Sequence, residues 1–185
     1  MQVRPLELDG VVEIIPEKFG DARGFFAETY VRSGFAAAGL NFDWVQDNQS
    51  LSAAKGVLRG LHFQVAPFAQ DKLIRVLRGS ILDVAADIRK GSPTHGQWVS
   101  CILSAEKFNQ LLIPRGFAHG FLTLEPATEV LYKVTAPYAP ECDRCIRWND
   151  PALGIDWQLG GVDPILSAKD RNAPLLADIA GKIWF

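Results

Sequence analysis

The sequence predicts an all-β fold, an antiparallel sandwich or barrel with helices confined to the ends of the chain. Three observations point to this fold class. Most apolar segments repeat with a period of two, turn-forming residues separate them at fairly regular intervals, and helical patterns occur only near the ends. Many short strands with little helix are typical of sandwiches and barrels. No repeat or linker-like stretch divides the 185 residues, so we expect one domain over 1–185, with a barrel core at about 24–150 and a C-terminal tail at 151–185.

The strand pattern, short and rich in β-branched and aromatic residues, recurs along the chain. In order, it covers residues 11–15, 24–30, 57–64, 72–76, 80–88, 97–103, 108–114, 116–124 and 128–134. Within 80–88 (SILDVAADI), apolar residues alternate with Asp83 and Asp87, which is the mark of a half-buried strand. A helix is predicted around 33–39, with Ser33 as N-cap and Gly39 as its stop, and another short helix from about residue 170.

The composition argues against several classes of partner. The net charge is −2, and no basic run offers a surface for nucleic acid or a membrane. No apolar stretch approaches the roughly 20 residues needed to cross a bilayer, and the N-terminus lacks a signal-peptide pattern. We therefore expect a cytoplasmic protein whose anionic ligands, if any, meet a local cluster of Arg and Lys.

Several kinds of chemistry have no motif here. The chain lacks a dinucleotide-binding G-x-G-x-x-G unit, a phosphate-binding P-loop and a G-x-S-x-G nucleophile elbow. Its three histidines are too few for a full ligand set of the kind that metal-binding cupins use, so we expect no metal and no cofactor. The C-x-x-C pair Cys142 and Cys145 has no second pair to complete a zinc site, and we interpret these cysteines and Cys101 as incidental thiols, the C-x-x-C pair lying in a loop.

The segment GVLRGLHFQ (56–64) poses the main question, because an apolar strand carries Arg59 and His62. A histidine in an apolar strand is often a hydrogen-bonded core residue, but arginine is rarely buried without a partner or an anionic ligand. Side chains alternate along a strand, so residues 59 and 62 should face opposite sides. If both serve one pocket, the strand must be kinked or bulged, and Gly60 is the residue that permits it. We predict such an irregularity at 60–61.

Other ionisable and polar residues on consecutive strands should converge at the mouth of the same barrel, where ligands usually bind. Lys72 begins one such strand at 72–76, and His119 lies within another at 116–124. For the others a structural reading competes with the functional one: a surface turn at DARGFFAE (21–28), a polar loop at VQDNQS (45–50), a core position for Tyr132, a corner at Tyr138, and a surface turn at LSAKD (166–170). His95 lies in the SPTHG turn and is expected to be only solvated.

Eight stretches of the chain resemble one family closely. They are FGDARGFFAE, VQDNQSLS, GVLRGLHFQ, QDKLIRVLRGSILDVAADIRKGSPT, IPRGFAHGFLTL, LYKVTAPYAP, IRWNDPALGIDW and LSAKD, in family order over residues 19–170. The chain is thereby identified as a member of the dTDP-4-dehydrorhamnose 3,5-epimerases. The resemblance implies a cupin-type jelly-roll β-barrel and a homodimer, in which an early strand such as 24–30 could be exchanged between protomers. It also implies conversion of dTDP-4-dehydro-6-deoxy-D-glucose to dTDP-4-dehydro-L-rhamnose, a step of L-rhamnose biosynthesis.

The resemblance also assigns roles to residues in the matching motifs. It implies that His62 is the general base, Tyr132 the general acid, Asp170 the partner of His62, and Lys72 a neighbour of the 4-keto oxygen of the substrate. Further residues would line the substrate site: Phe19, Arg23, Glu28, Gln46, Asn48, Arg59, His119, Tyr138, Asp143 and Lys169.

The implied chemistry needs neither metal nor hydride cofactor, because the ketone acidifies the hydrogens at C3 and C5, and an acid and a base on opposite faces suffice. Three alternatives remain open: a mono-epimerase acting at C3 or C5 on another dTDP-4-keto sugar, a non-catalytic sugar-nucleotide-binding cupin, and a metal-dependent cupin enzyme.

Overall fold

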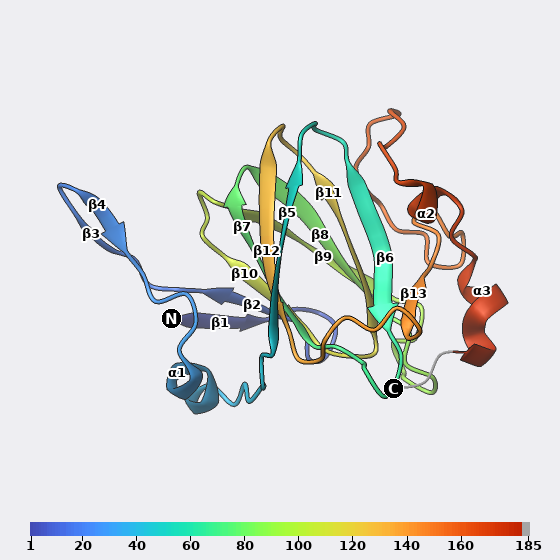
Figure 1. The fold of residues 1–185 in the computed structure, drawn as a ribbon, viewed down its shortest axis with the longest axis horizontal. Helices are drawn as coiled ribbons and strands as arrows, with labels where there is room; N and C mark the ends of the chain where they lie inside the picture. The colour runs from blue at the N-terminus through green and yellow to red at the C-terminus, as the bar shows by residue number, and fades with distance from the viewer. Residues whose placement is uncertain (183–185) are drawn as a thin grey trace.

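The computed structural model describes residues 1–182 and is built almost entirely from antiparallel strands, which confirms the all-β prediction (Figure 1). One sheet has six strands in the order β1 (Gln2–Pro5), β2 (Val12–Ile15), β10 (Gln110–Ile113), β7 (Lys72–Arg78), β12 (Thr128–Val134) and β5 (Gln46–Ser52). A second sheet has five strands in the order β13 (Asp143–Cys145), β6 (Leu58–Gln64), β11 (Phe117–Thr123), β8 (Ser80–Asp87) and β9 (Trp98–Ser104). Strands β3 (Phe19–Asp21) and β4 (Gly24–Phe26) form a separate hairpin.

The two larger sheets face each other and bury the main core between them. Ile74 and Val130 of the six-stranded sheet share one cluster with Ile81 and Phe117 of the five-stranded sheet. In the part of the chain that the structure describes, hydrogen bonds do not join the sheets into a closed barrel, so the body is a two-sheet jelly-roll sandwich. The predicted strands all occur, although the segment 24–30 is strand only at Gly24–Phe26.

The C-terminal segment covers the outer face of the five-stranded sheet, as the red end of the chain in Figure 1 shows. Leu82 and Val84 of β8 pack there with Trp157 and Leu176. The prediction of a half-buried strand at 80–88 was therefore wrong, because every residue of β8 is buried. Leu82 and Val84 face this outer cover, whereas Ile81 and Asp83 face the interior between the sheets.

The helices are short and lie at the ends of the body. Helix α1 (Arg32–Ala37) places Phe35 against Val12 on the outer face of the six-stranded sheet. The N-cap of α1 is Val31, which makes no side-chain capping bond, so the predicted capping by Ser33 was wrong. In the tail, α2 (Ala168–Arg171) and α3 (Leu176–Ile179) precede a 3-10 turn, η1 (Ala180–Lys182). No helix within residues 1–182 is long and apolar enough to cross a membrane.

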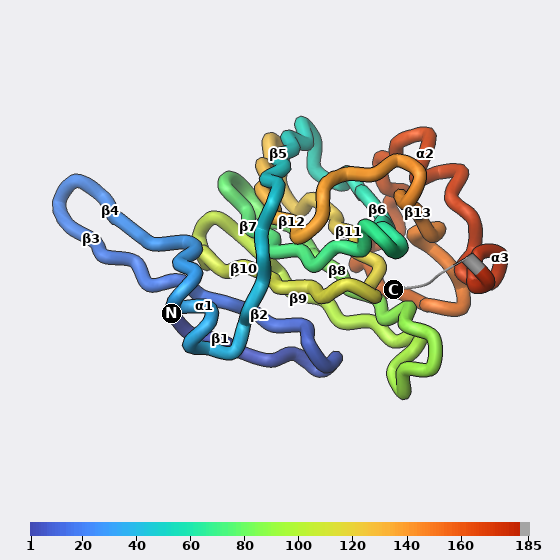
Figure 2. The backbone as a smooth tube through the Cα atoms, turned by 60° about the horizontal axis from the view of Figure 1, so that its bottom comes forward, coloured from blue at the N-terminus to red at the C-terminus, as the bar shows by residue number. Residues whose placement is uncertain are grey.

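The β3–β4 hairpin projects away from the sandwich in both views (Figures 1 and 2). All of its strand residues are exposed, and Phe19, Phe25 and Phe26 leave 54%, 58% and 66% of their surface in contact with solvent. Such large aromatic rings on a protruding hairpin are unusual for a free surface, and contiguous exposed apolar groups commonly mark an interaction site.

Strand β6 is irregular at Gly60, which confirms the irregularity predicted at 60–61. His119 and Phe121 are two residues apart on β11, yet they pair with His62 and Arg59, which are three residues apart on β6. Gly60 has φ +134°, and its peptide bond to Leu61 is cis. The bulge turns both Arg59 and His62 toward one cavity.

Candidate active site

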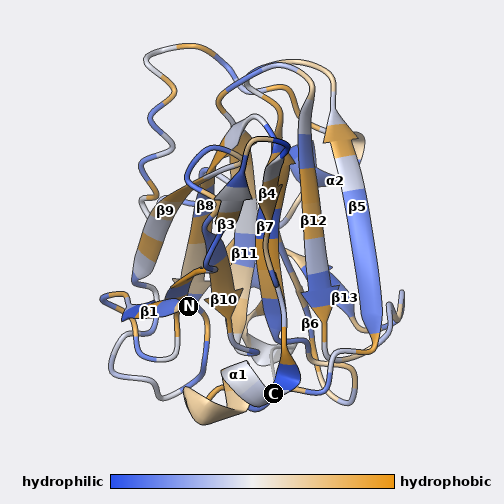
Figure 3. Ribbon diagram, turned by 90° about the vertical axis from the view of Figure 1, so that its left-hand side faces the viewer, coloured by the Kyte–Doolittle hydropathy of each residue, from blue (hydrophilic) through white to orange (hydrophobic). Residues whose placement is uncertain are grey.

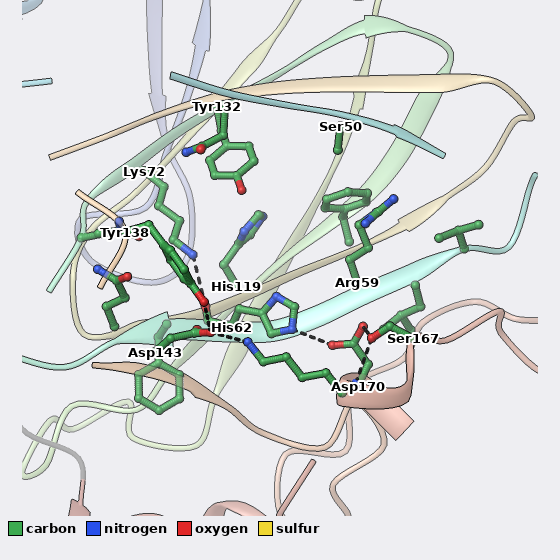
Figure 4. A pocket seen from close by; sticks show the side chains of 18 of the residues that line it. Ser50, Arg59, His62, Lys72, His119, Tyr132, Tyr138, Asp143, Ser167 and Asp170 are labelled. Atoms are coloured by element: carbon green, nitrogen blue, oxygen red, sulfur yellow. Dashed lines mark hydrogen bonds and ion pairs between the residues drawn. The ribbon is translucent and has the colours of Figure 1, made fainter. Parts of the chain in front are cut away.

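A cavity of about 480 Å³ lies between the two sheets, and the segment 165–170 contributes to its wall (Figure 4). Every residue to which the resemblance assigned a site role lines this cavity, except Phe19, Arg23 and Glu28. The six-stranded sheet supplies Gln46, Asn48, Lys72 and Tyr132; the five-stranded sheet supplies Arg59, His62, His119 and Asp143; loops and α2 supply Tyr138, Lys169 and Asp170.

His62 is held by a carboxylate on α2. Its Nε2 lies 2.6 Å from Oδ1 of Asp170, whose Oδ2 accepts a hydrogen bond from Ser167 Oγ at 2.7 Å. Burial raises the pKa of Asp170, but hydrogen bonds from His62 and Ser167 outweigh it and bring the pKa below the usual value, so the group is ionised. Asp170 therefore accepts a hydrogen bond from Nε2–H of His62. The side chain of His62 is one-third exposed, and its Nδ1 faces the cavity.

Tyr132 lies across the cavity from His62, on the opposite sheet (Figure 4). Burial raises the pKa of its hydroxyl above the usual 10, with a partly opposing effect of the positive charge of Arg59. The phenol is therefore protonated at neutral pH. The cavity thus has a proton acceptor on one wall and a proton donor on the other.

Lys72 is buried beside both groups. Its Nζ donates to the carbonyl oxygen of His62 at 3.2 Å. Burial lowers the pKa of Lys72 to about 8, while the charges of Asp143 and Asp83 act in the opposite direction. Lys72 is thus largely cationic at neutral pH and loses its charge as the pH rises through about 8.

His119 forms a second imidazole–carboxylate pair beside the first. It is the cross-strand partner of His62, and its Nε2 lies 2.6 Å from Oδ1 of the fully buried Asp83. The alternation in the sequence suggested that Asp83 lies on an exposed side of its strand. The structure instead places the carboxylate in the interior, where it holds the ring of His119 at the wall of the cavity.

Polar groups extend the cavity at one end. The backbone N–H of the exposed Tyr138 donates to Gln46, and its hydroxyl donates to Asp143, which also forms an ion pair with Lys169. Burial lowers the pKa of Lys169, but the bond to Asp143 outweighs it and raises the pKa above the usual value. Arg59 reaches the cavity from β6 on the side opposite Tyr138 (Figure 4) and donates to Ser52 Oγ at 3.3 Å. A planar exposed ring together with Arg and Lys suits a nucleoside diphosphate.

Phe19, Arg23 and Glu28 lie away from this cavity. Arg23 is paired with Asp21 at the tip of the hairpin. Phe19 and Glu28 line a separate cavity of about 200 Å³ near α1. The structure of one chain therefore does not bring these three residues to the site that the resemblance assigned to them.

Several residues of the cavity were missed by the sequence analysis. Ser50 follows Gln46 and Asn48 at a spacing of two along β5, so strand alternation could have found it. Ser167 begins the capping sequence S-A-K-D, whose first and fourth residues bond each other, and this pattern could have linked it to Asp170. Phe121 lies two residues after His119 on β11, so the same alternation places it on the face of His119.

The cysteines are free thiols. Cys142 is in a turn, but Cys145 ends strand β13 as the cross-strand partner of His62, so the interpretation of the pair as a loop feature was wrong for Cys145. Within residues 1–182 no group of three or more His, Cys, Asp or Glu side chains is placed to share a metal ion.

Comparison with known proteins places these features in context. The family model described as dTDP-4-dehydrorhamnose 3,5-epimerase matches residues 5–178. The dTDP-4-dehydrorhamnose 3,5-epimerase of Sinorhizobium fredii is 50% identical over 179 residues, which is 97% of this chain and 91% of that protein. The crystal structure of dTDP-6-deoxy-D-glucose-3,5-epimerase from Legionella pneumophila, in complex with dTDP-4-keto-L-rhamnose, is 44% identical with a TM-score of 0.93 and covers 100% of this chain and 98% of that one. A 3'-monoepimerase from Streptomyces bikiniensis, in complex with dTDP-quinovose, is 34% identical with a TM-score of 0.89 over 97% of this chain and 90% of that one.

Proposed function

The chain belongs to the dTDP-4-dehydrorhamnose 3,5-epimerase family, and from this premise we propose that its cavity converts dTDP-4-dehydro-6-deoxy-D-glucose to dTDP-4-dehydro-L-rhamnose. The reaction is an isomerisation that inverts C3 and C5. The observation that supports it most directly is the pair of His62 and Tyr132 facing each other across one cavity from two sheets.

Inversion of a carbon next to a ketone proceeds by loss of a proton to give an enolate and return of a proton to the other face. Nδ1 of His62 takes the proton from C3 or C5, because Nε2 is already bonded to Asp170. The ionised Asp170 then stabilises the imidazolium that forms. A positioned base of this kind typically contributes about 10²–10⁴-fold to the rate.

The enolate oxygen at C4 needs positive charge beside it. Lys72 supplies an ammonium in a buried site, where such a charge acts more strongly than in water. Tyr132 donates its phenolic proton to the opposite face of the carbanion, and the resulting phenolate is reprotonated from solvent as His62 releases its proton. In this scheme Lys72 stabilises the charge on the enolate oxygen, and Tyr132 protonates the enolate carbon.

The rest of the cavity is proposed to hold the nucleotide. Arg59 and Lys169 bind the diphosphate, Tyr138 stacks on the base, and Gln46, Asn48, Asp143 and His119 provide hydrogen-bonding groups around the sugar nucleotide. No metal or cofactor takes part in this scheme, and the cytoplasmic location expected from the sequence stays a prediction.

A mono-epimerase is the second candidate, because a 3'-monoepimerase shares the fold over nearly the whole chain. Incubation of the substrate in D₂O, followed by ¹H NMR, separates the two. Since one base and one acid serve both carbons in our scheme, we expect deuterium at C3 and at C5 and a product of the L-rhamno configuration. Exchange at a single carbon would assign mono-epimerisation, and no exchange at either carbon would rule out both.

We further propose that the protein is a homodimer in which the β3–β4 hairpin of each protomer reaches the cavity of its partner. The support is that Phe19, Arg23 and Glu28 belong to the site by family resemblance, while in their own chain they lie outside it. The exposed phenylalanine rings of the projecting hairpin would then be covered by the partner.

A mixed dimer tests the exchange of hairpins. We expect Arg23→Ala/Glu28→Ala and His62→Ala homodimers to be inactive, and the isolated heterodimer to recover about half of the wild-type activity per dimer, because one of its two equivalent sites is complete. The heterodimer is prepared by co-expression with two affinity tags. If each hairpin serves its own chain, the heterodimer will be as inactive as the two parents, and a monomer in size-exclusion chromatography with light scattering would exclude the dimer itself.

A further inference from the structure

Strand β5 presents a row of polar side chains to the cavity. It is an edge strand in which every second residue faces inward, and its inward residues Gln46, Asn48, Ser50 and Ser52 are all polar. Figure 3 shows the strand as hydrophilic along most of its length. The inward-facing positions of a sheet normally carry apolar residues. Four polar side chains at such positions therefore need hydrogen-bond partners.

Three of the four residues in this row have such partners. Gln46 donates to Asn48 at 2.7 Å and accepts from the backbone of Tyr138, and Ser52 accepts from Arg59. The hydroxyl of Ser50 is buried, and within residues 1–182 it has no hydrogen-bond partner. A buried hydroxyl without a partner is unfavourable, and this one points into the cavity (Figure 4). Ser50 therefore has a free donor and acceptor at the wall of the cavity in which we propose that the sugar nucleotide binds.

The position of Ser50 on β5 indicates which part of the ligand its hydroxyl would contact. In the register of β5 and β12, Asn48 is opposite Tyr132, and Ser50 is opposite Val130, two residues further along. Diagonal neighbours of this kind on one face of a sheet are roughly 7–8 Å apart between their Cα atoms, with side chains within reach of each other. Because Tyr132 must reach C3 or C5 of the sugar, a group one row away contacts the same hexose ring.

We propose that the Ser50 hydroxyl binds a hydroxyl group of the substrate's hexose ring and so helps to place the ring between His62 and Tyr132. This inference rests on the proposed function. A serine hydroxyl donates and accepts, and the hexose of a 4-keto-6-deoxy sugar nucleotide has hydroxyls at C2 and C3 that do the same. The contact forms only with ligand present, so it should contribute to binding of the sugar and not to stability of the free protein.

Replacement by alanine separates these effects. Ser50→Ala is expected to lower kcat/KM for the 4-keto sugar nucleotide roughly 3- to 10-fold, the effect of one neutral hydrogen bond. By calorimetry, its Kd for dTDP-glucose, which carries a hexose but no ketone, should rise by a similar factor, while its Kd for dTDP should not change. The melting temperature should stay the same or rise, since alanine removes a buried hydroxyl that has no partner. Ser50→Thr keeps the hydroxyl and should retain part of the affinity for the hexose.

The matched control is Ser100→Ala, which removes a hydroxyl from the edge strand β9 away from the cavity and should change none of these quantities. An unchanged Kd for dTDP-glucose in Ser50→Ala would overturn the inference. Equal weakening for dTDP would assign the contact to a phosphate instead, and a lower melting temperature with lower activity would assign a structural role. If wild-type protein binds dTDP-glucose but does not turn over the keto sugar, the proposed function fails while the Ser50 contact can still be tested.

Discussion

His62→Ala is expected to lower kcat by about 10²–10⁴-fold, the usual contribution of a positioned general base. The variant lacks the imidazole whose Nδ1 faces the cavity, and within residues 1–182 the other ring close to this position, that of His119, is already paired through its Nε2 with Asp83. The base acts at both carbons in the proposed scheme. Deuterium exchange in D₂O should therefore be lost at C3 and C5 together.

Two further measurements make this result specific. Affinity for dTDP should be retained, because the proposed nucleotide contacts of Arg59, Tyr138 and Lys169 are intact. His95→Ala is the matched control, since His95 is exposed, its ring hydrogen-bonds to the Arg89 carbonyl, and it does not line the cavity of His62. If His62→Ala still exchanges one of the two hydrogens at the wild-type rate, a second base exists and the single-base scheme is wrong.

Tyr132→Phe is expected to separate exchange from inversion. The variant keeps His62 and its carboxylate, so a proton can still leave the sugar and return from the same face. Without the phenol on the opposite wall, the rate of formation of inverted product should fall by at least about 10²-fold, as expected for loss of a general acid. Proton NMR in D₂O should show deuterium entering unconverted substrate faster than product appears.

Tyr30→Phe provides the control, because Tyr30 packs against Phe35 and Trp44 outside the cavity. Loss of exchange along with loss of inversion in Tyr132→Phe would mean that the phenol is needed for enolate formation. Inversion at the wild-type rate would mean that another group donates the proton.

The strands were predictable from sequence because period-two alternation depends on local geometry alone. Alternation also shows which residues share a face, but not which face another part of the chain will cover. This is why Asp83 was misjudged: residues 151–182 bury the far side of β8, and the carboxylate is on the side of His119. Arg59 and His62 could be linked in advance because Gly60 between them is a recognisable point of irregularity.

Other parts of the site depend on contacts that a sequence pattern does not contain. Alternation places Ser50 on the face of Asn48 and Phe121 on the face of His119, but that these two faces enclose one cavity follows from how the two sheets pack. The hairpin is a different case. Its family motif was recognisable, but the motif alone did not indicate that its side chains lie outside the cavity of their own chain.

The bulge in β6 has a consequence for how the sequence can vary. A Cβ on Gly60 would lie 2.5 Å from the Cα of Gly120 in β11, and a Cβ on Gly120 would lie 2.9 Å from the carbonyl oxygen of Arg59. Neither clash is with a flexible side chain that could move aside. Neither glycine can therefore be replaced alone without displacing the backbone of the other strand, so backbone contact across β6 and β11 sets the spacing between Arg59 and His62.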